Sequence, residues 1–84
     1  MKGAKMDTLL ENIDKLHTTT KGLERMQRNL EIDEDIVTWL KSRINQNVMM
    51  LRKGKNLYIS FDRYTFTINA NTYTIITAHK NHDY

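Results

Sequence analysis

The sequence contains no cysteine, and this absence removes several kinds of chemistry at once. Without cysteine the chain has no disulfide framework, no thiolate ligand for a metal and no cysteine nucleophile. It also has no apolar run near the ~20 residues that a membrane-spanning helix needs. Its three glycines are isolated from one another, so no glycine-rich loop is available to cradle a phosphate. These absences favour a protein of a reducing compartment, and we expect it in the cytoplasm with no membrane partner.

The 84 residues are enough for one domain with a thin core. A chain of this size buries roughly 60–65% of its unfolded surface, which suits two packed layers better than a deep cleft and a second domain. We expect a single domain over residues 1–84, with flexible ends at 1–6 and 81–84. The N-terminal segment mixes acidic residues into its apolar pattern and predicts no signal peptide. A bacterial or phage-type protein is the default interpretation.

The net charge of +3 belongs to the second half of the chain. Residues 1–46 hold eight basic and eight acidic side chains and are neutral as a group. The basic residues that follow are Arg52, Lys53, Lys55, Arg63 and Lys80. A patch of this kind is compatible with phosphate contact. Ordinary solubility charge, with lysine protecting an edge strand, explains it equally well.

Apolar residues at helical spacing predict three helices in the first half of the chain. The expected ranges are 7–17, 20–30 and 33–46, with caps at Asp7 or Thr8, at Thr19 or Thr20, and at Asp33. Trp39 lies at the margin of the third apolar stripe, and we expect it to cover the edge of the core.

Alternating residues in the second half predict four strands joined by three turns. The turns are expected at Gly54, at Asp62-Arg63 and at 69–71. A two-residue loop at Asp62-Arg63 places one apolar set on one face: Leu57, Ile59, Phe61, Tyr64, Phe66 and Ile68. An even-length third loop adds Tyr73, Ile75 and Thr77 to that face. The first strand, 47–52, stays open, because either Val48 and Met50 or Met49 and Leu51 point inward.

The expected fold is α+β, with three N-terminal helices packed on one face of a four-stranded antiparallel β-meander. The opposite face would be rich in hydroxyl groups and would also carry Ala78 and Lys80. From this arrangement we expect a binding surface made by Arg52, Lys53, Lys55, Tyr58, Arg63, Thr77, His79 and Lys80. Threonine-rich faces are also common simply because threonine suits strands.

One arrangement in the strand half suggests catalysis. In one register Asp62 lies opposite His79, where a carboxylate can orient an imidazole for proton transfer. Lys80 or another cation would then stabilise negative charge, which would suffice for metal-independent RNA cleavage. A surface ion pair at a hairpin end explains the same residues. His79 and His82 are three residues apart, but with only His17 besides them we expect no metal site and no cofactor.

Two stretches carry a family resemblance: NIDKLHTTTKGLERMQRNL, residues 12–30, and RKGKNLYISFDRYTFTINANTYTIITAHK, residues 52–80. Together they resemble a family of small bacterial proteins known only as domain-of-unknown-function family 3781. The resemblance implies a single-domain protein and supplies no catalytic residues. The order of helices and strands is also similar to that of barnase, EndoU, colicin and RelE-type RNases, which is an analogy of fold alone.

We therefore expect a small binding module that contacts nucleic acid or a protein through the basic turn and the open sheet face. The alternatives are an inhibitor of a host protein from a phage or mobile element, a protein that forms a homodimer through a sheet edge, and a toxin-type RNase.

Overall fold

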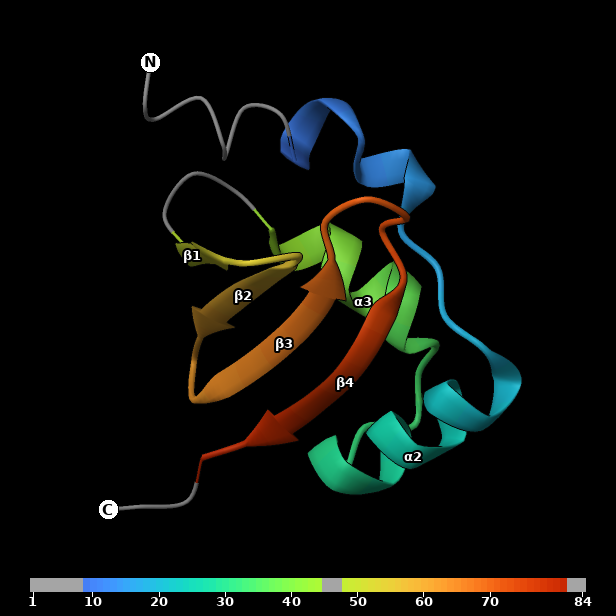
Figure 1. Ribbon diagram of the computed structural model, residues 1–84. Helices are drawn as coiled ribbons and strands as arrows, with labels where there is room; N and C mark the ends of the chain where they lie inside the picture. The colour runs from blue at the N-terminus through green and yellow to red at the C-terminus, as the bar shows by residue number, and fades with distance from the viewer. Residues whose placement is uncertain (1–8, 45–47, 82–84) are drawn as a thin grey trace.

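The computed structural model describes residues 9–44 and 48–81 and shows an α+β fold. The four strands form one antiparallel sheet in the order β1-β2-β3-β4 (Figure 1). The elements are η1 (Ile13–Lys15), α2 (Thr20–Leu30), α3 (Ile36–Arg43), β1 (Met49–Lys53), β2 (Asn56–Phe61), β3 (Tyr64–Asn69) and β4 (Ile75–Lys80). Among these residues, no helix is both long enough and apolar enough to cross a membrane.

The first predicted helix is shorter than expected. Residues 9–11 are helical, the chain then turns at Asn12, and η1 ends before the extended residue Leu16. His17 leaves the helix and forms a parallel bridge with Thr74. Its N–H donates to the Tyr73 carbonyl at 3.2 Å, and its carbonyl accepts from the Ile75 N–H at 2.8 Å. The proposed caps at residues 7 and 8 lie outside the described residues.

Helix α2 confirms the second prediction. Thr19 is its N-cap, and the Thr19 hydroxyl accepts from the Gly22 N–H at 3.0 Å. Met26 and Leu30 are buried on the inner side of the helix. Glu31 ends it in the left-handed conformation, with φ of 60°.

Helix α3 is shorter than the predicted 33–46, and its cap is Asp35 instead of Asp33. One Asp35 oxygen accepts from the N–H groups of Val37 at 2.9 Å and Thr38 at 3.3 Å. Of the three consecutive acidic residues, Asp35 is the one whose side chain reaches these two free donors, so the helix begins after it. The helix ends at Arg43, because Ile44 is extended.

Trp39 lies inside the core and is 7% exposed, so its predicted place at the core margin understates its burial. Its ring meets Tyr64 edge-on at 5.0 Å between centroids and lies 6.0 Å from Phe61 and 6.1 Å from Phe66. The Arg43 guanidinium covers the indole at 4.2 Å from its centroid. Trp39 thereby joins α3 to strands β2 and β3.

The β2–β3 hairpin has the predicted register. Phe61 pairs with Tyr64, Ile59 with Phe66 and Leu57 with Ile68. Asp62 and Arg63 form the two-residue turn with φ of 49° and 72°, the left-handed values that such a turn requires. The turn between β1 and β2 places Gly54 at φ of 61°, as expected for glycine at this position.

The third turn is longer than predicted, and strand β4 contains a bulge. The loop covers residues 70–74, and its left-handed residue is Tyr73, with φ of 61°, instead of an asparagine. Ile68 pairs with Ile75 but Thr67 pairs with Thr77, so Ile76 is an extra residue. The bulge reverses the predicted alternation: Ala78 is fully buried in the core, and Thr77 is exposed.

The register of β1 resolves the choice that the sequence left open. Met50 pairs with Ile59 and lies on the core side, whereas Leu51 pairs with Tyr58 and Met49 with Ser60. Met49 and Leu51 are therefore exposed, at 74% and 60%. Counting back from the Gly54-Lys55 turn gives this register, but the apolar run from Val48 to Leu51 hides it from a periodicity argument.

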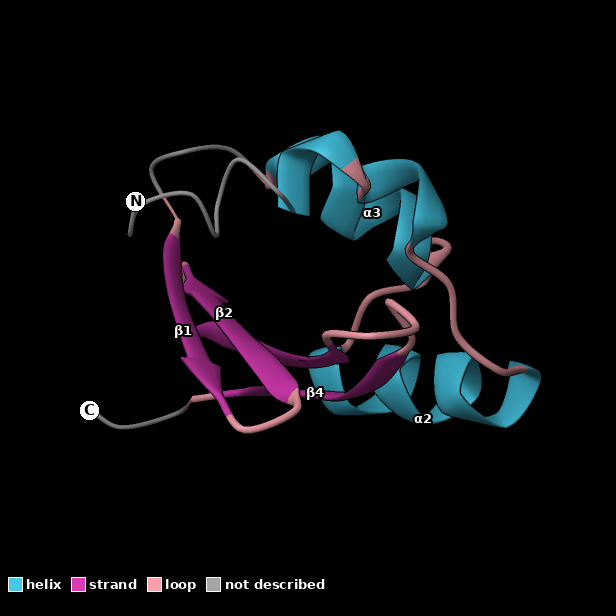
Figure 2. Ribbon diagram, turned by 45° about the horizontal axis from the view of Figure 1, so that its top comes forward, coloured by secondary structure: helices cyan, strands magenta, loops and turns pink. Residues whose placement is uncertain are grey.

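Helix α2 lies along the edge of β4 that faces away from β3 (Figures 1 and 2). The Thr18 hydroxyl donates to the Ile75 carbonyl at 2.9 Å, and the Asn29 amide donates to the Ala78 carbonyl at 3.3 Å. Helix α3 instead stands over the sheet in Figure 2. The prediction that all three helices pack on one face of the sheet is therefore not confirmed, because α3 stands over the sheet whereas α2 lies along the edge of β4.

Candidate functional site

The predicted basic residues separate into two groups at opposite ends of the sheet. Arg52, Lys53 and Lys55 surround the β1–β2 turn and are exposed. Arg63 lies in the β2–β3 turn, at the other end of β2. Strand β2 has six residues, which corresponds to about 20 Å between the two ends.

Lys80 does not lie on the outer sheet face where the sequence placed it. It pairs with Tyr64, whose ring packs against Trp39, so its side chain lies on the helix side. Its ammonium nitrogen is 4.0 Å from a Glu31 carboxylate oxygen and 6.0 Å from the Tyr64 ring centroid. Lys80 therefore contributes no charge to the outer face.

The catalytic candidates Asp62, His79 and Lys80 are not brought together. His79 pairs with Thr65, not with Asp62, because the bulge in β4 and the longer third loop shift the register. Its side chain is exposed on the outer face, while the next residue, Lys80, faces the helix side. The carboxylate-oriented imidazole that the sequence suggested is therefore absent from the described part of the chain.

The outer face of the sheet carries the remaining predicted site residues, Tyr58, Thr77 and His79. Tyr58 is half-buried, and its hydroxyl accepts from the Asn56 amide at 3.5 Å. Ser60 and Thr65 share a hydrogen bond of 3.4 Å between their hydroxyl groups. The centre of this face is thus polar and bonded within itself, with one aromatic ring available for stacking.

One margin of the outer face is apolar. Met49 and Leu51 stand next to each other on this face of β1, with Lys53 following them. They are two of the three large exposed hydrophobic side chains among the described residues, the third being Ile76 on β4. Adjacent exposed apolar groups on an edge strand are typical of a contact surface, whereas single ones are ordinary.

The backbone of β1 also has an open side. A two-residue turn makes its flanking pair, Lys53 and Asn56, a hydrogen-bonded pair, and the bonded pairs then alternate along the ladder. Met49, Leu51 and Lys53 consequently bond to β2, while the N–H and C=O groups of Met50 and Arg52 point away from it. Within residues 9–44 and 48–81, no other strand pairs with this edge.

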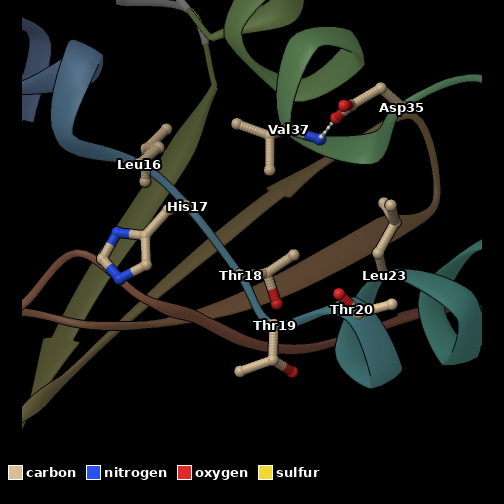
Figure 3. A pocket seen from close by; sticks show the side chains of 8 residues that line it. All are labelled: Leu16, His17, Thr18, Thr19, Thr20, Leu23, Asp35 and Val37. Carbon is tan, nitrogen blue, oxygen red and sulfur yellow. Dashed lines mark hydrogen bonds between the residues drawn. The ribbon is translucent and has the colours of Figure 1, made fainter.

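A separate pocket of about 310 Å³ lies between the start of α2, the start of α3 and the strand-like segment before α2. Figure 3 shows the side chains that line it. The lining residues are Leu16, His17, Thr18, Thr19, Thr20, Leu23, Asp35 and Val37.

Two polar side chains of this pocket, His17 and Asp35, already have partners within the fold. Both ring nitrogens of His17 have partners: Nδ1 lies 2.8 Å from the Lys15 carbonyl and Nε2 lies 3.0 Å from the Thr74 hydroxyl. A carbonyl only accepts, so Nδ1 carries the proton, and in the neutral ring Nε2 accepts from Thr74. The Asp35 carboxylate caps α3 (Figure 3). The pocket's imidazole and its carboxylate are thus already engaged in the fold.

No cluster of three histidine or acidic side chains suited to a metal ion occurs among the residues that the structure describes. His82, half of the His-x-x-His pair considered in the sequence, lies outside those residues.

Comparison with known proteins gives one family match. The model of a family described as "Protein of unknown function (DUF3781)" matches residues 10–79, which confirms the resemblance seen in the sequence. No curated protein and no solved structure matches the chain, so the likeness to RNase folds gains no support. This range covers η1, α2, α3, the first three strands and all of β4 except its last residue, Lys80. The chain therefore belongs to the DUF3781 family.

Proposed function

We propose that this protein is a binding module that contacts another polypeptide through strand β1 and the adjoining outer face of the sheet. The observation that carries the proposal is the exposure of Met49 and Leu51 side by side on edge strand β1, whose outer edge pairs with no other strand that the structure describes. Methionine is enriched at the centres of protein interfaces, and lysine is depleted there. The cations at the β1–β2 turn would lie at the rim.

Two further observations support a binding role over a catalytic one. His79 lies on the outer face, Lys80 on the helix side and Asp62 in the β2–β3 turn. In the pocket, the Asp35 carboxylate caps α3, and both ring nitrogens of His17 have partners. The open backbone groups of Met50 and Arg52 offer a partner strand main-chain hydrogen bonds, while Met49 and Leu51 offer it side-chain contacts. This combination is the pattern of strand addition at a sheet edge.

The test is a pull-down with the immobilised protein as bait. Two samples are offered to it: an extract of the cells that naturally make the protein, and a differently tagged copy of the same chain. Leu51→Glu places a charge in the proposed contact, and Ile76→Glu places one on the distant strand β4 as the control. We expect a retained protein to be lost by the Leu51 variant only. Titration of that purified protein should then show binding weakened at least about tenfold, or about 1.4 kcal/mol. Equal binding by the two variants would rule out the β1 surface.

Nucleic acid is the second candidate partner, and the observation that favours it is the group of exposed cations at the β1–β2 turn. We expect such binding to weaken steeply with salt, because each neutralised phosphate releases a counterion. Gel-shift titrations of wild type and of a Lys53→Glu/Lys55→Glu variant at several salt concentrations would test it. Binding that is absent at low salt, or that does not change with salt, would exclude it.

A further inference from the structure

We propose that the partner of β1 is the β1 strand of a second copy of this chain, paired antiparallel about a two-fold axis at Leu51. The proposal rests on the proposed function, because it names the polypeptide that covers the β1 surface. It would join two four-stranded sheets into one continuous sheet of eight strands.

The direction of the backbone groups selects this register. Met50 and Arg52 are the β1 residues whose N–H and C=O groups point to the free edge. With Leu51 on the axis, Met50 of each copy lies opposite Arg52 of the other, and both pairs are hydrogen-bonded pairs. Every free-edge donor and acceptor of these two residues is then satisfied. Leu51 occupies the non-hydrogen-bonded position between them, where the two strands approach most closely.

The side chains agree with the same register. Leu51 meets its own copy on the outer face, and each Met49 lies opposite Lys53 of the other copy, so the most exposed apolar side chains become covered. No cation lies directly opposite a cation, since Arg52 faces Met50. An axis at Arg52 would place two guanidinium groups opposite each other, which is unfavourable. An axis at Met50 would pair Arg52 with Val48, which lies before the start of β1.

The structure also explains why such pairing would stop at two copies. The opposite edge of the sheet, on β4, is occupied by the His17 bridge and by the side chains of Thr18 and Asn29. Each copy therefore offers one open edge, and a contact made by the same patch on both copies closes on itself. A filament would need a second open edge on each chain.

The first measurement is molar mass in solution by light scattering over a concentration series. We expect wild type and Ile76→Glu to form a dimer and Leu51→Glu to dissociate, with a dissociation constant raised at least about tenfold. Circular dichroism and Trp39 fluorescence would verify that the Leu51 variant is folded. A wild-type chain that stays monomeric at every concentration would overturn the proposal.

The second measurement fixes the register. The chain contains no cysteine, so a single introduced cysteine has no competitor. Opposed residues at a non-hydrogen-bonded position have Cα atoms about 4.5 Å apart, within the range for a disulfide. Leu51→Cys should therefore form a disulfide-linked dimer rapidly under mild oxidation. Met49→Cys is the control, because its two copies would lie four residue spacings apart, about 13 Å.

The outcomes separate this inference from the proposed function. A monomeric chain that still captures another protein in a Leu51-dependent manner would overturn the dimer and leave the binding role intact. A dimer in which Met49→Cys links as fast as Leu51→Cys would overturn the register at Leu51. A dimer that Leu51→Glu does not weaken would place the dimer contact elsewhere and refute the pairing of β1 with its own copy, while Leu51-dependent capture of another protein would still support the proposed function.

Discussion

The hydroxyl of Thr18 donates to the carbonyl of Ile75 across 2.9 Å, although the two residues are 57 positions apart in the chain. Beside this bond lies Gly22 in the first turn of α2. A Cβ atom at Gly22 would come within 2.7 Å of the Thr18 hydroxyl oxygen and 3.0 Å of the Thr19 hydroxyl oxygen. The missing side chain at residue 22 thus permits the bond that fastens the segment before α2 to the edge of β4.

Because of this contact, we expect the effect of Gly22→Ala on stability to depend on whether Thr18 is present. Alanine favours a helix over glycine, but here its methyl group displaces the Thr18 hydroxyl and leaves the Ile75 carbonyl without that donor. In a Thr18→Ala background the displaced hydroxyl is already absent. We expect Gly22→Ala to be about 1 kcal/mol more favourable in that background than in wild type, as measured by urea unfolding of all four proteins. Additive effects would show that Gly22 and Thr18 are not coupled.

The cap of α3 gives a prediction with a matched control. Asp35→Ala removes the acceptor for the Val37 and Thr38 N–H groups, so we expect a loss of about 1 kcal/mol in the free energy of unfolding. Asp33→Ala, two residues earlier, removes a carboxylate that does not cap the helix and should change stability by less than about 0.5 kcal/mol. A larger loss of stability for Asp33→Ala than for Asp35→Ala would indicate that Asp33 caps the helix, as predicted from the sequence.

The β2–β3 hairpin was predictable because its signals are local. Asp62 and Arg63 interrupt two alternating runs, and a two-residue turn then leaves one register. The third turn carries no such signal. Ile75 and Ile76 are identical neighbours, so alternation does not reveal which one is the extra residue of the bulge. Directly before the bulge, the N–H and carbonyl of Ile75 bond to His17 and Thr18, which are distant in sequence.

For the candidate site too, features set by local sequence were predicted correctly, whereas features set by distant contacts were not. The turn at Gly54 was predicted correctly, because such a turn needs only a glycine and its neighbours, and its cations are exposed. Lys80 and His79 were assigned to wrong surroundings, since one extra residue in β4 exchanges the two faces of the strand. The apolar margin at Met49 and Leu51 was missed because it follows from the pairing of β1 and not from periodicity.

The bulge can be tested with two neighbouring substitutions in β4. Ala78 is fully buried, and Thr77 is exposed on the outer face. We expect Ala78→Leu to destabilise the fold by about 1–3 kcal/mol, because the core has no room for the added methylene groups. Thr77→Leu should stay within about 0.5 kcal/mol of wild type. Thermal or urea unfolding would measure both, and the opposite ranking would favour the register without a bulge.

The aromatic cluster around Trp39 supplies both a prediction and a probe. Trp39 is the single tryptophan of the chain, so its fluorescence reports the core directly. Trp39→Ala should cost about 3–5 kcal/mol, as expected for a large buried aromatic side chain. Arg43→Ala removes the cation above the ring together with its hydrogen bonds to the Trp39 carbonyl and the Ser42 hydroxyl. Arg43 is exposed, and we expect a loss of about 0.5–1 kcal/mol. Equal losses for the two variants would mean that Trp39 does not anchor α3 to the sheet.

The placement of His79 makes a prediction about RNA cleavage. His79 lies on the outer face opposite Thr65, Asp62 lies in a turn, and Lys80 points to the helix side near Glu31. Among the residues that the structure describes, no carboxylate is hydrogen-bonded to the imidazole, and the neighbouring cation, Lys80, faces the other side of the sheet. We expect purified wild-type protein to leave bulk RNA intact in chelator-containing buffer, with His79→Ala indistinguishable from it. If wild type cleaved RNA, His79→Ala abolished the cleavage and the control Lys55→Ala retained it, this expectation would be wrong. The RNase function would then be supported, with His79 acting at a distance from Asp62.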